Sequence, residues 1–350
     1  MAVVLPIWRQ PRKSGPMSDH IKSEKRRALG LLTLNRPKAL NALDHGMILG
    51  ITAALQAWAV DDQIKAVAIR GEGRGFCSGG DIRAVQKWVV AGETTGFDLL
   101  RDEYRMNALI AAYPKPYIAL IHGICMGGGA GVSVHGKARL ADASLSFAMP
   151  ETAIGFIPDV GASFFLSRLP DELGMYLGLT GSAIGLGDAL DCGLMTHAVD
   201  QTDFDTVIEA LAQGRDFASF VKKVKPGPLA AQRKHIATLF AAQSVEAILE
   251  RLDRDGSDFA RDTAATMRLR SSTSLKLVLR QLRAARTLNL QQCLAMEFRL
   301  ANHVLPSHDF REGVRAALID KDRNPQWQPA SLAGVGDLDG FFAPVAEELF

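Results

Sequence analysis

The sequence predicts an α/β fold in which a parallel sheet is covered by helices and is followed by a region of helices alone. Three observations support this prediction. Short apolar runs alternate with segments of helical periodicity between residues 29 and 148, which is the pattern of repeated strand–helix units. Glycine-rich turns separate several of these runs. Strand signals almost disappear after residue 202.

Composition narrows the possible classes of protein. The 350 residues are 47% hydrophobic, which is enough for a large core and argues against global disorder. A net charge of +2 is too small to indicate nucleic-acid binding. The four cysteines are scattered without a CxxC motif, so free thiols are expected rather than disulfides or a zinc site. No apolar run is long enough for a transmembrane helix.

The chain divides into three parts. Residues 1–20 are basic, interrupted by proline and almost free of acids, so we expect a disordered extension of a cytoplasmic protein. A transit peptide, and with it a mitochondrial-matrix location, is the alternative. Residues 21–202 are the expected α/β core, and residues 203–350 form the expected helical region.

Periodicity places the individual elements. In the first region we expect strands at 29–34, 64–69, 117–122, 138–141 and 144–148, and helices at 44–60, with Asp44 as N-cap, and at 97–113. In the second region we expect helices at 207–211, 229–239, 245–252, 259–270 and 274–303. Seven basic residues lie between Arg268 and Arg299. A solvated helix face is the favoured interpretation, and a patch for a phosphate group or RNA is the alternative.

Two glycine-rich turns are candidate anion sites. Gly79-Gly80 and the triplet that starts at Gly127 each stand between a strand-like run and a helix-like one. Backbone N–H groups are free at such positions, so two turns facing one point would form an oxyanion hole. Tight turns without a ligand are the alternative. Neither turn matches a P-loop or a dinucleotide-binding fingerprint.

Glu151 and Asp159 are the candidate catalytic acids. Two prolines and a glycine exclude a regular helix across residues 150–159, so a loop can bring both carboxylates to one site. The surrounding residues are apolar, which favours raised pKa values and general acid–base chemistry. Alternatively, Glu151 is a surface acid and Asp159 caps the next helix.

Other reactive side chains fit no known catalytic pattern. Ser78, His122 and Asp81 could form a triad on paper, but the sequence has no G-x-S-x-G motif. His122 and His135 lack metal-ligand spacing, so we expect structural histidines and no metal site.

Four ordered motifs resemble the crotonase (enoyl-CoA hydratase/isomerase) superfamily from residue 29 to the C-terminus. They are LTLNRPKALNAL, GFCSGGDI, KPYIALIHGICMGGGAGVSVHG and FAMPETAIGFIPDVGASFFLSRL. Within the superfamily, the segments TSLKLVLRQL, AMEFRL and DFREGVRAALIDKDRNPQWQP are most similar to the 3-hydroxyisobutyryl-CoA hydrolase branch.

The resemblance implies a crotonase-like fold of repeated ββα units with a helical C-terminal region, and it assigns roles to residues. The backbone N–H groups of Gly80 and Gly128 would form the oxyanion hole for an acyl-CoA thioester. Asp81 and Ile82 would line the path of the acyl-CoA, and Glu103 would contact the substrate.

The departures from the hydratase pattern indicate the reaction. Gly131 stands where hydratases of the superfamily have one of two glutamates, whereas Glu151 keeps the other, and Asp159 replaces a small residue. The resemblance therefore implies hydrolysis of 3-hydroxyisobutyryl-CoA, a step of valine catabolism, with Glu151 as nucleophile or general base. CoA would be part of the substrate, with no separate cofactor, and a homo-oligomer is possible. The alternatives are an enoyl-CoA hydratase or isomerase and a non-catalytic protein that binds RNA or a partner.

Overall fold

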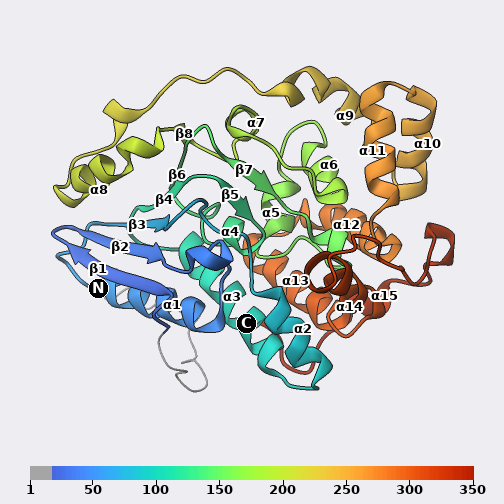
Figure 1. Cartoon of the computed structure of the whole chain (residues 1–350), viewed down its shortest axis with the longest axis horizontal. Coiled ribbons are helices and arrows are strands. Elements are labelled where there is room, and N and C mark those ends of the chain that lie inside the picture. Colours follow the sequence, from blue (N-terminus) through green and yellow to red (C-terminus); the bar gives the residue numbers. More distant parts are fainter. Residues whose placement is uncertain (1–17) are drawn as a thin grey trace.

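The computed structural model describes residues 18–350 and contains two sheets (Figure 1). The expected extension at 1–20 lies outside the described residues except for its last three. The larger sheet has six strands in the order β1-β2-β3-β4-β6-β8, and β5 pairs with β7 in a second sheet. The strands are β1 (Ile21–Arg26), β2 (Leu29–Leu34), β3 (Ala66–Gly71), β4 (Tyr117–Ile121), β5 (Ile124–Met126), β6 (Ala138–Ala141), β7 (Ser146–Ala148) and β8 (His197–Ala198).

The predicted α/β class is confirmed. All strand pairs from β2 to β8 are parallel, and every residue of β2 and β4 is buried, as expected for a sheet covered on both faces. The sequence analysis missed β1, which pairs with β2 in antiparallel orientation. Only Ile21 of this edge strand is buried, so the strand carries no hydrophobic pattern that would reveal it.

Helices of the first region cover the sheet and follow its strands. Asp44 is the N-cap of the first helix, as predicted, and accepts a hydrogen bond from Met47 N at 2.8 Å. The helices are α1 (His45–Ala59), α2 (Ile82–Val90), α3 (Thr95–Ala111), α4 (Gly128–Gly131), α5 (Ala162–Leu166), α6 (Leu173–Thr180) and α7 (Leu186–Asp191).

The region after β8 is helical as expected, but its longest predicted helix is wrong. The segment expected as one helix at 274–303 is two helices, because Asn289 forms a capping box with Gln292 and starts a new one. The helices are α8 (Phe204–Ala212), α9 (Arg233–Leu239), α10 (Val245–Asp255), α11 (Asp258–Arg268), α12 (Ser272–Ala285), α13 (Leu290–Val304), α14 (His308–Val314) and α15 (Asp339–Phe342). A π-helical turn, Arg315–Ile319, continues α14.

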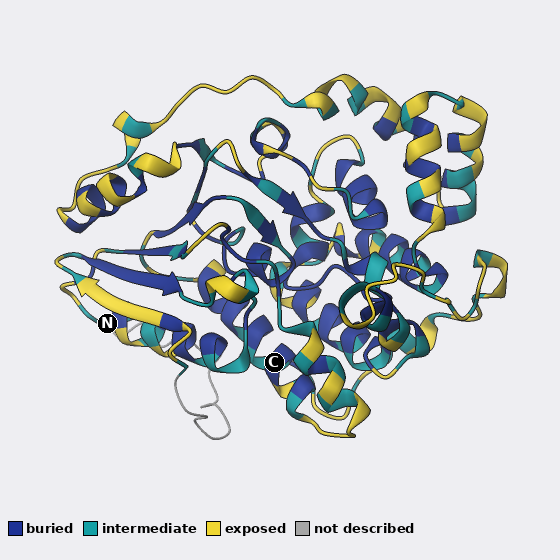
Figure 2. Ribbon diagram, viewed as in Figure 1, coloured by how far each residue is buried: buried dark blue, intermediate teal, exposed yellow. Residues whose placement is uncertain are grey.

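The helical region packs directly against the sheet-bearing region. One hydrophobic cluster contains residues of both, and Figure 2 shows the buried residues continuing from the strands into α12 and α13. At the junction, Tyr104 of α3 meets Phe298 of α13 edge-on, with ring centroids 6.2 Å apart. The division at residue 202 therefore separates two kinds of secondary structure that share a core.

The basic residues between Arg268 and Arg299 form ion pairs and hydrogen bonds within the protein. Arg283 and Arg286 both pair with Glu172, at 2.9 and 2.6 Å, and Arg270 donates to Thr180 O. The remaining members pair with acids elsewhere in the chain: Arg268 with Asp253, Lys276 with Glu246, Arg280 with Asp339 and Arg299 with Glu348. Several of these side chains are partly exposed, as expected for a solvated face, but each also has a partner: Arg270, Arg283 and Arg286 bond to the first region, and the other four pair within the helical region.

Close contact between α5 and α6 depends on Gly174, which gives a stability prediction. A Cβ at this position would lie 1.8 Å from Leu166 O, so the two helices would have to separate. We expect Gly174→Ala to destabilise the protein by about 3 kcal/mol or more, at the upper end of the usual cost of overpacking. Urea unfolding measures the change. Gly336→Ala is the control, because a Cβ there meets no atom within 4 Å, and equal stability of the two variants would contradict the prediction.

Candidate active site

A cavity of about 890 Å³ collects all the predicted site residues. Both glycine turns, the loop at 150–160 and one face of α3 form its walls, together with parts of the segments 36–42 and 317–321. The residues predicted from the sequence that line it are Gly80, Asp81, Ile82, Glu103, Gly128, Glu151 and Asp159.

The two glycine turns face each other across a short gap. Gly80 N lies 3.2 Å from the point that a Cβ of Gly128 would occupy. Gly79 and Gly127 have positive φ values of 115° and 48°, a conformation that glycine adopts readily. Among residues 18–350, neither Gly80 N nor Gly128 N donates a hydrogen bond to another group. Two N–H groups are therefore available to a single oxygen atom of a ligand.

Glu151 and Asp159 are both buried in the cavity wall. Glu151 begins a 3₁₀ turn after β7, its side chain is buried, and its Oε2 has no partner in the described structure. Burial, with the charge of Asp159 adding to it, raises the pKa of Glu151 well above its usual value. Neither alternative from the sequence holds, because Glu151 is not a surface acid and the residue that caps α5 is Gly161.

Asp159 is held by a tyrosine that the sequence analysis did not single out. Tyr104 Oη donates a hydrogen bond of 2.6 Å to Asp159 Oδ2. Burial raises the pKa of Asp159 to about 7, and the hydrogen bond from Tyr104 opposes this rise. Tyr104 directly follows Glu103 on α3. The same helix therefore carries one buried acid, Glu103, and holds a second one, Asp159, by a hydrogen bond.

Glu103 lies beside the second glycine turn. Its Oε1 is 2.6 Å from the position of a Cβ on Gly128 and has no partner in residues 18–350. Burial, followed by the charge of Asp159, raises the pKa of Glu103 to about 8. The side chain of Glu103 is only 2% exposed.

Asp81 and Ile82 line the cavity at the start of α2. The carboxylate of Asp81 caps this helix by accepting from Ala84 N at 3.2 Å, and it pairs with Arg36 at 2.7 Å. Its oxygens are therefore engaged within the protein, and Ile82 supplies the apolar surface.

Gly131 has no space for a side chain. A Cβ there would lie 2.8 Å from both Asn107 Nδ2 and Val160 Cβ. The packing around Gly131 therefore leaves no room for the side chain of an acid at this position.

Glu297 is a further buried acid that the sequence analysis missed. It lies on α13, is fully buried, and accepts hydrogen bonds from Gly161 N and Ser163 N at 2.7 and 2.8 Å. A signal was present in the sequence, because Glu297 interrupts the apolar stripe formed by Cys293, Leu300 and Val304.

The two histidines are structural, as expected: His122 bonds to Gly73 O and His135 to Val160 O, both at 2.8 Å.

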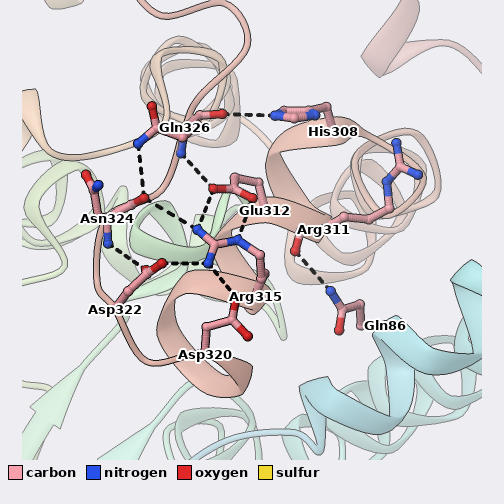
Figure 3. A network of polar contacts seen from close by, with 9 residues as sticks. All are labelled: Gln86, His308, Arg311, Glu312, Arg315, Asp320, Asp322, Asn324 and Gln326. Atoms are coloured by element: carbon pink, nitrogen blue, oxygen red, sulfur yellow. Dashed lines mark hydrogen bonds and ion pairs between the residues drawn. The ribbon is translucent and has the colours of Figure 1, made fainter.

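A segment near the C-terminus contributes to the wall of the cavity. Ala317, Leu318 and Lys321 line the cavity there. Figure 3 shows the network that fixes this segment, in which Arg315 pairs with three acids, Glu312, Asp320 and Asp322. Hydrogen bonds from α2 join it to the first glycine turn, one from Gln86 to Arg311 O and one from Arg83 to Leu318 O.

Residues 18–350 contain neither a candidate metal site nor a candidate membrane-spanning helix. No group of three or more His, Cys, Asp or Glu side chains is arranged to hold a metal ion. No helix in this range has the length and apolar character needed to cross a membrane.

Solved structures with the same architecture come from acyl-CoA enzymes. A carnitinyl-CoA dehydratase from Mycobacterium thermoresistibile is 38% identical, with a TM-score of 0.92 over 95% of this chain and 99% of its own. An enoyl-CoA hydratase from Rhodobacter sphaeroides 2.4.1 is 37% identical, with a TM-score of 0.91 over 95% of this chain and 100% of its own. The expected crotonase-like fold is confirmed.

Sequence relatives share almost the whole chain. The mitochondrial 3-hydroxyisobutyryl-CoA hydrolase of Xenopus tropicalis is 44% identical over 89% of this chain and 86% of its own, and that of Homo sapiens is 40% identical over 92% and 87%. The family model described as enoyl-CoA hydratase/isomerase matches residues 29–339. The chain therefore belongs to the enoyl-CoA hydratase/isomerase family, the crotonase superfamily that its motifs indicated.

Proposed function

We propose that this protein is a thioesterase that converts 3-hydroxyisobutyryl-CoA and water to 3-hydroxyisobutyrate and CoA. The observation that carries the proposal is one cavity that contains two available backbone N–H groups and three buried carboxyl groups, with no space for an acid at Gly131. Relatives at 40–44% identity are named as hydrolases of this thioester, which supports the same substrate here.

Charge at the cavity suits the CoA part of the substrate. Lys38, Arg74 and Lys321 line the cavity, and none of them forms an ion pair with another described residue. Phosphate groups of CoA are negatively charged and would be attracted to these cations. The acyl group would then point toward the glycine turns. CoA belongs to the substrate, so the proposed reaction needs no separate cofactor.

The glycine turns would stabilise the reacting oxygen. With the thioester oxygen between Gly80 N and Gly128 N, both N–H groups donate to the negative charge that develops on it when the carbonyl carbon is attacked. These donors are fixed in place before the reaction, so no reorganisation opposes the transition state.

Glu151 can act in two ways. As a nucleophile, its carboxylate forms a bond to the carbonyl carbon and the C–S bond breaks, which gives a mixed anhydride and CoA thiolate, and water then cleaves the anhydride. As a general base, Glu151 removes a proton from water while the water oxygen attacks the same carbon; the C–S bond then breaks, and the departing CoA sulfur takes up the proton. Both routes need an ionised Glu151, although burial favours its neutral form.

Asp159 would influence the ionisation of Glu151. In addition to burial, the charge on Asp159 raises the pKa of Glu151, so Glu151 ionises more readily while Asp159 is neutral. An ionised Asp159 orients the 3-hydroxyl group of the acyl chain or assists the water, and its hydrogen bond from Tyr104 fixes its direction.

Hydration of an enoyl-CoA is the second candidate, because the two similar solved structures are those of a carnitinyl-CoA dehydratase and an enoyl-CoA hydratase. Water addition to a double bond needs a base and an acid. One of the two glutamates that hydratases use for these roles would stand at position 131, where the packing leaves no space for its side chain. Release of free thiol from 3-hydroxyisobutyryl-CoA, compared with loss of the double bond of crotonyl-CoA, distinguishes the two reactions. The third candidate, RNA binding, loses its main support because the basic run is engaged in ion pairs.

The compartment and the oligomeric state are further parts of the proposal. The relatives named above carry the word mitochondrial in their names, which favours the mitochondrial-matrix alternative over the cytoplasmic location we expected. Residues 1–17, on which a targeting segment would depend, lie outside the described residues. A homo-oligomer stays a prediction.

Glu151→Gln should nearly abolish thioester hydrolysis. The amide cannot form the anhydride or accept a proton from water, and loss of general-base catalysis alone costs a factor of roughly 10²–10⁴ in kcat. A thiol-release assay measures the loss. Single turnover of the wild type in ¹⁸O-water, followed by mass analysis of the peptide that contains Glu151, separates the two routes. A Glu151→Gln variant with near-wild-type activity would refute the assignment.

Tyr104→Phe should move the pH dependence of hydrolysis toward higher pH. The lost hydrogen bond stabilises the carboxylate of Asp159, so its removal raises the pKa of that group and the carboxyl pair loses its first proton at a higher pH. We expect the rising limb of kcat/KM against pH to lie at a higher pH than in the wild type. Tyr113→Phe is the control, because this hydroxyl bonds to Leu55 O instead. A shift to lower pH would contradict the prediction.

Gly131→Glu should not create a hydratase. The new side chain would collide with Asn107 and Val160, so we expect a lower melting temperature and weaker hydrolysis, without gain of activity on crotonyl-CoA. Thermal unfolding and the crotonyl-CoA assay test both parts. A stable variant that hydrates crotonyl-CoA would show that the site can accept the missing acid.

A further inference from the structure

The backbone beside Asp159 is strained. Val160 has φ of 55°, in the left-handed region, and Gly161 follows with φ of 85°. A β-branched residue rarely adopts this conformation, and strain of this kind persists only where surrounding groups enforce it. Because Val160 directly follows Asp159, the same turn sets the direction of the Asp159 side chain.

Three polar side chains from distant parts of the chain hold this turn. Gln281 of α12 donates to Pro158 O at 2.7 Å, and His135 bonds to Val160 O at 2.8 Å. Glu297 of α13 provides the largest set of contacts. Its Oε2 accepts from Gly161 N at 2.7 Å, and its Oε1 accepts from Ser163 N at 2.8 Å and Ser163 Oγ at 2.5 Å. The turn is therefore fixed on both sides of Val160.

Glu297 is an unusual choice for a purely structural contact. Its side chain is fully buried, and it forms no ion pair with a described residue. Burial raises the pKa of Glu297 to about 8 in spite of the three hydrogen bonds. A buried carboxyl group without a cation is costly, and apolar residues often replace such groups without loss of stability. An unfavourable free energy of burial is expected where the buried group is needed for the function of the site.

We propose that Glu297 is a positioning residue, which holds the strained turn at 158–163 so that the carboxylate of Asp159 points into the cavity. It acts through the backbone at Gly161 and Ser163 and does not touch the substrate. This inference rests on the proposed function in assigning a catalytic role to Asp159. A residue of the helical region would then contribute to catalysis without lining the cavity.

Glu297→Gln tests the contact with little change of shape. Its NH₂ group must face either Gly161 N–H or the two donors of Ser163, so at least one hydrogen bond becomes a donor–donor contact. We expect kcat for 3-hydroxyisobutyryl-CoA to fall about 10- to 100-fold, the scale of a small displacement of a catalytic group. KM should change by less than about a factor of two, because Glu297 is outside the binding surface.

Ser163→Ala and Val304→Ala complete the comparison. Ser163→Ala removes one of the three donors to Glu297 and should give a smaller fall in kcat that is not additive with Glu297→Gln, since both act on one contact. Val304 is buried two turns further along α13. Val304→Ala should lower the melting temperature through a small cavity while leaving kcat at 25 °C unchanged.

Hydrogen–deuterium exchange gives a readout that does not require the reaction. Amides of the peptide covering 158–163 should exchange faster in Glu297→Gln than in wild type, and those of β4 should be unchanged. Wild-type kcat together with unchanged exchange in this variant would overturn the inference, as would an equal fall of kcat in Val304→Ala. If the wild type does not hydrolyse the thioester, the proposed function fails, whereas faster exchange at 158–163 would still support the positioning contact.

Discussion

Burial of four carboxyl groups without a cation beside them is the constraint on which the site depends. Glu103, Glu151, Asp159 and Glu297 are each less than 9% exposed, and burial is the main cause of the raised pKa of each one. Ionisation of one opposes ionisation of its neighbours. The free site therefore retains protons near neutral pH, and the protein around it must be rigid enough to prevent these groups from turning toward water.

Two helices that lie far apart in the sequence, α3 and α13, provide that rigidity. α3 carries Glu103 and, through Tyr104, holds the side chain of Asp159. α13 holds the backbone just after Asp159 through Glu297. The same helices meet through Tyr104 and Phe298, so the hydrophobic core and the polar site share one junction. The helical region is thus part of the site as well as a cover for it.

Local patterns predicted the groups that lie next to each other in sequence, and missed those that meet only in the fold. Glycine spacing and the PETAIGFIPD loop led to the two glycine turns and to Glu151 and Asp159 without any knowledge of distance, and the family resemblance then singled out Gly80 and Gly128 within the turns. The partnership of Glu297 with Gly161 spans 136 residues, and no local rule connects them. The break at Asn289 and the edge strand β1 were missed for a related reason: a cap can look like a continuing helix, and an exposed strand lacks a buried face.

The left-handed turn at Val160 adjoins the two positions at which this chain departs from the hydratase pattern, Gly131 and Asp159. The left-handed turn at Val160 places its side chain against Gly131, where the missing glutamate would start, and the same turn orients the neighbouring Asp159. Asn107 fills the rest of that space, and neither atom of its amide has a partner in the described structure. A side chain at 131 and Val160 in its present conformation would occupy the same volume. An acid at 131 therefore requires a different arrangement of Val160 and Asn107, and substitution of Gly131 alone would not be enough.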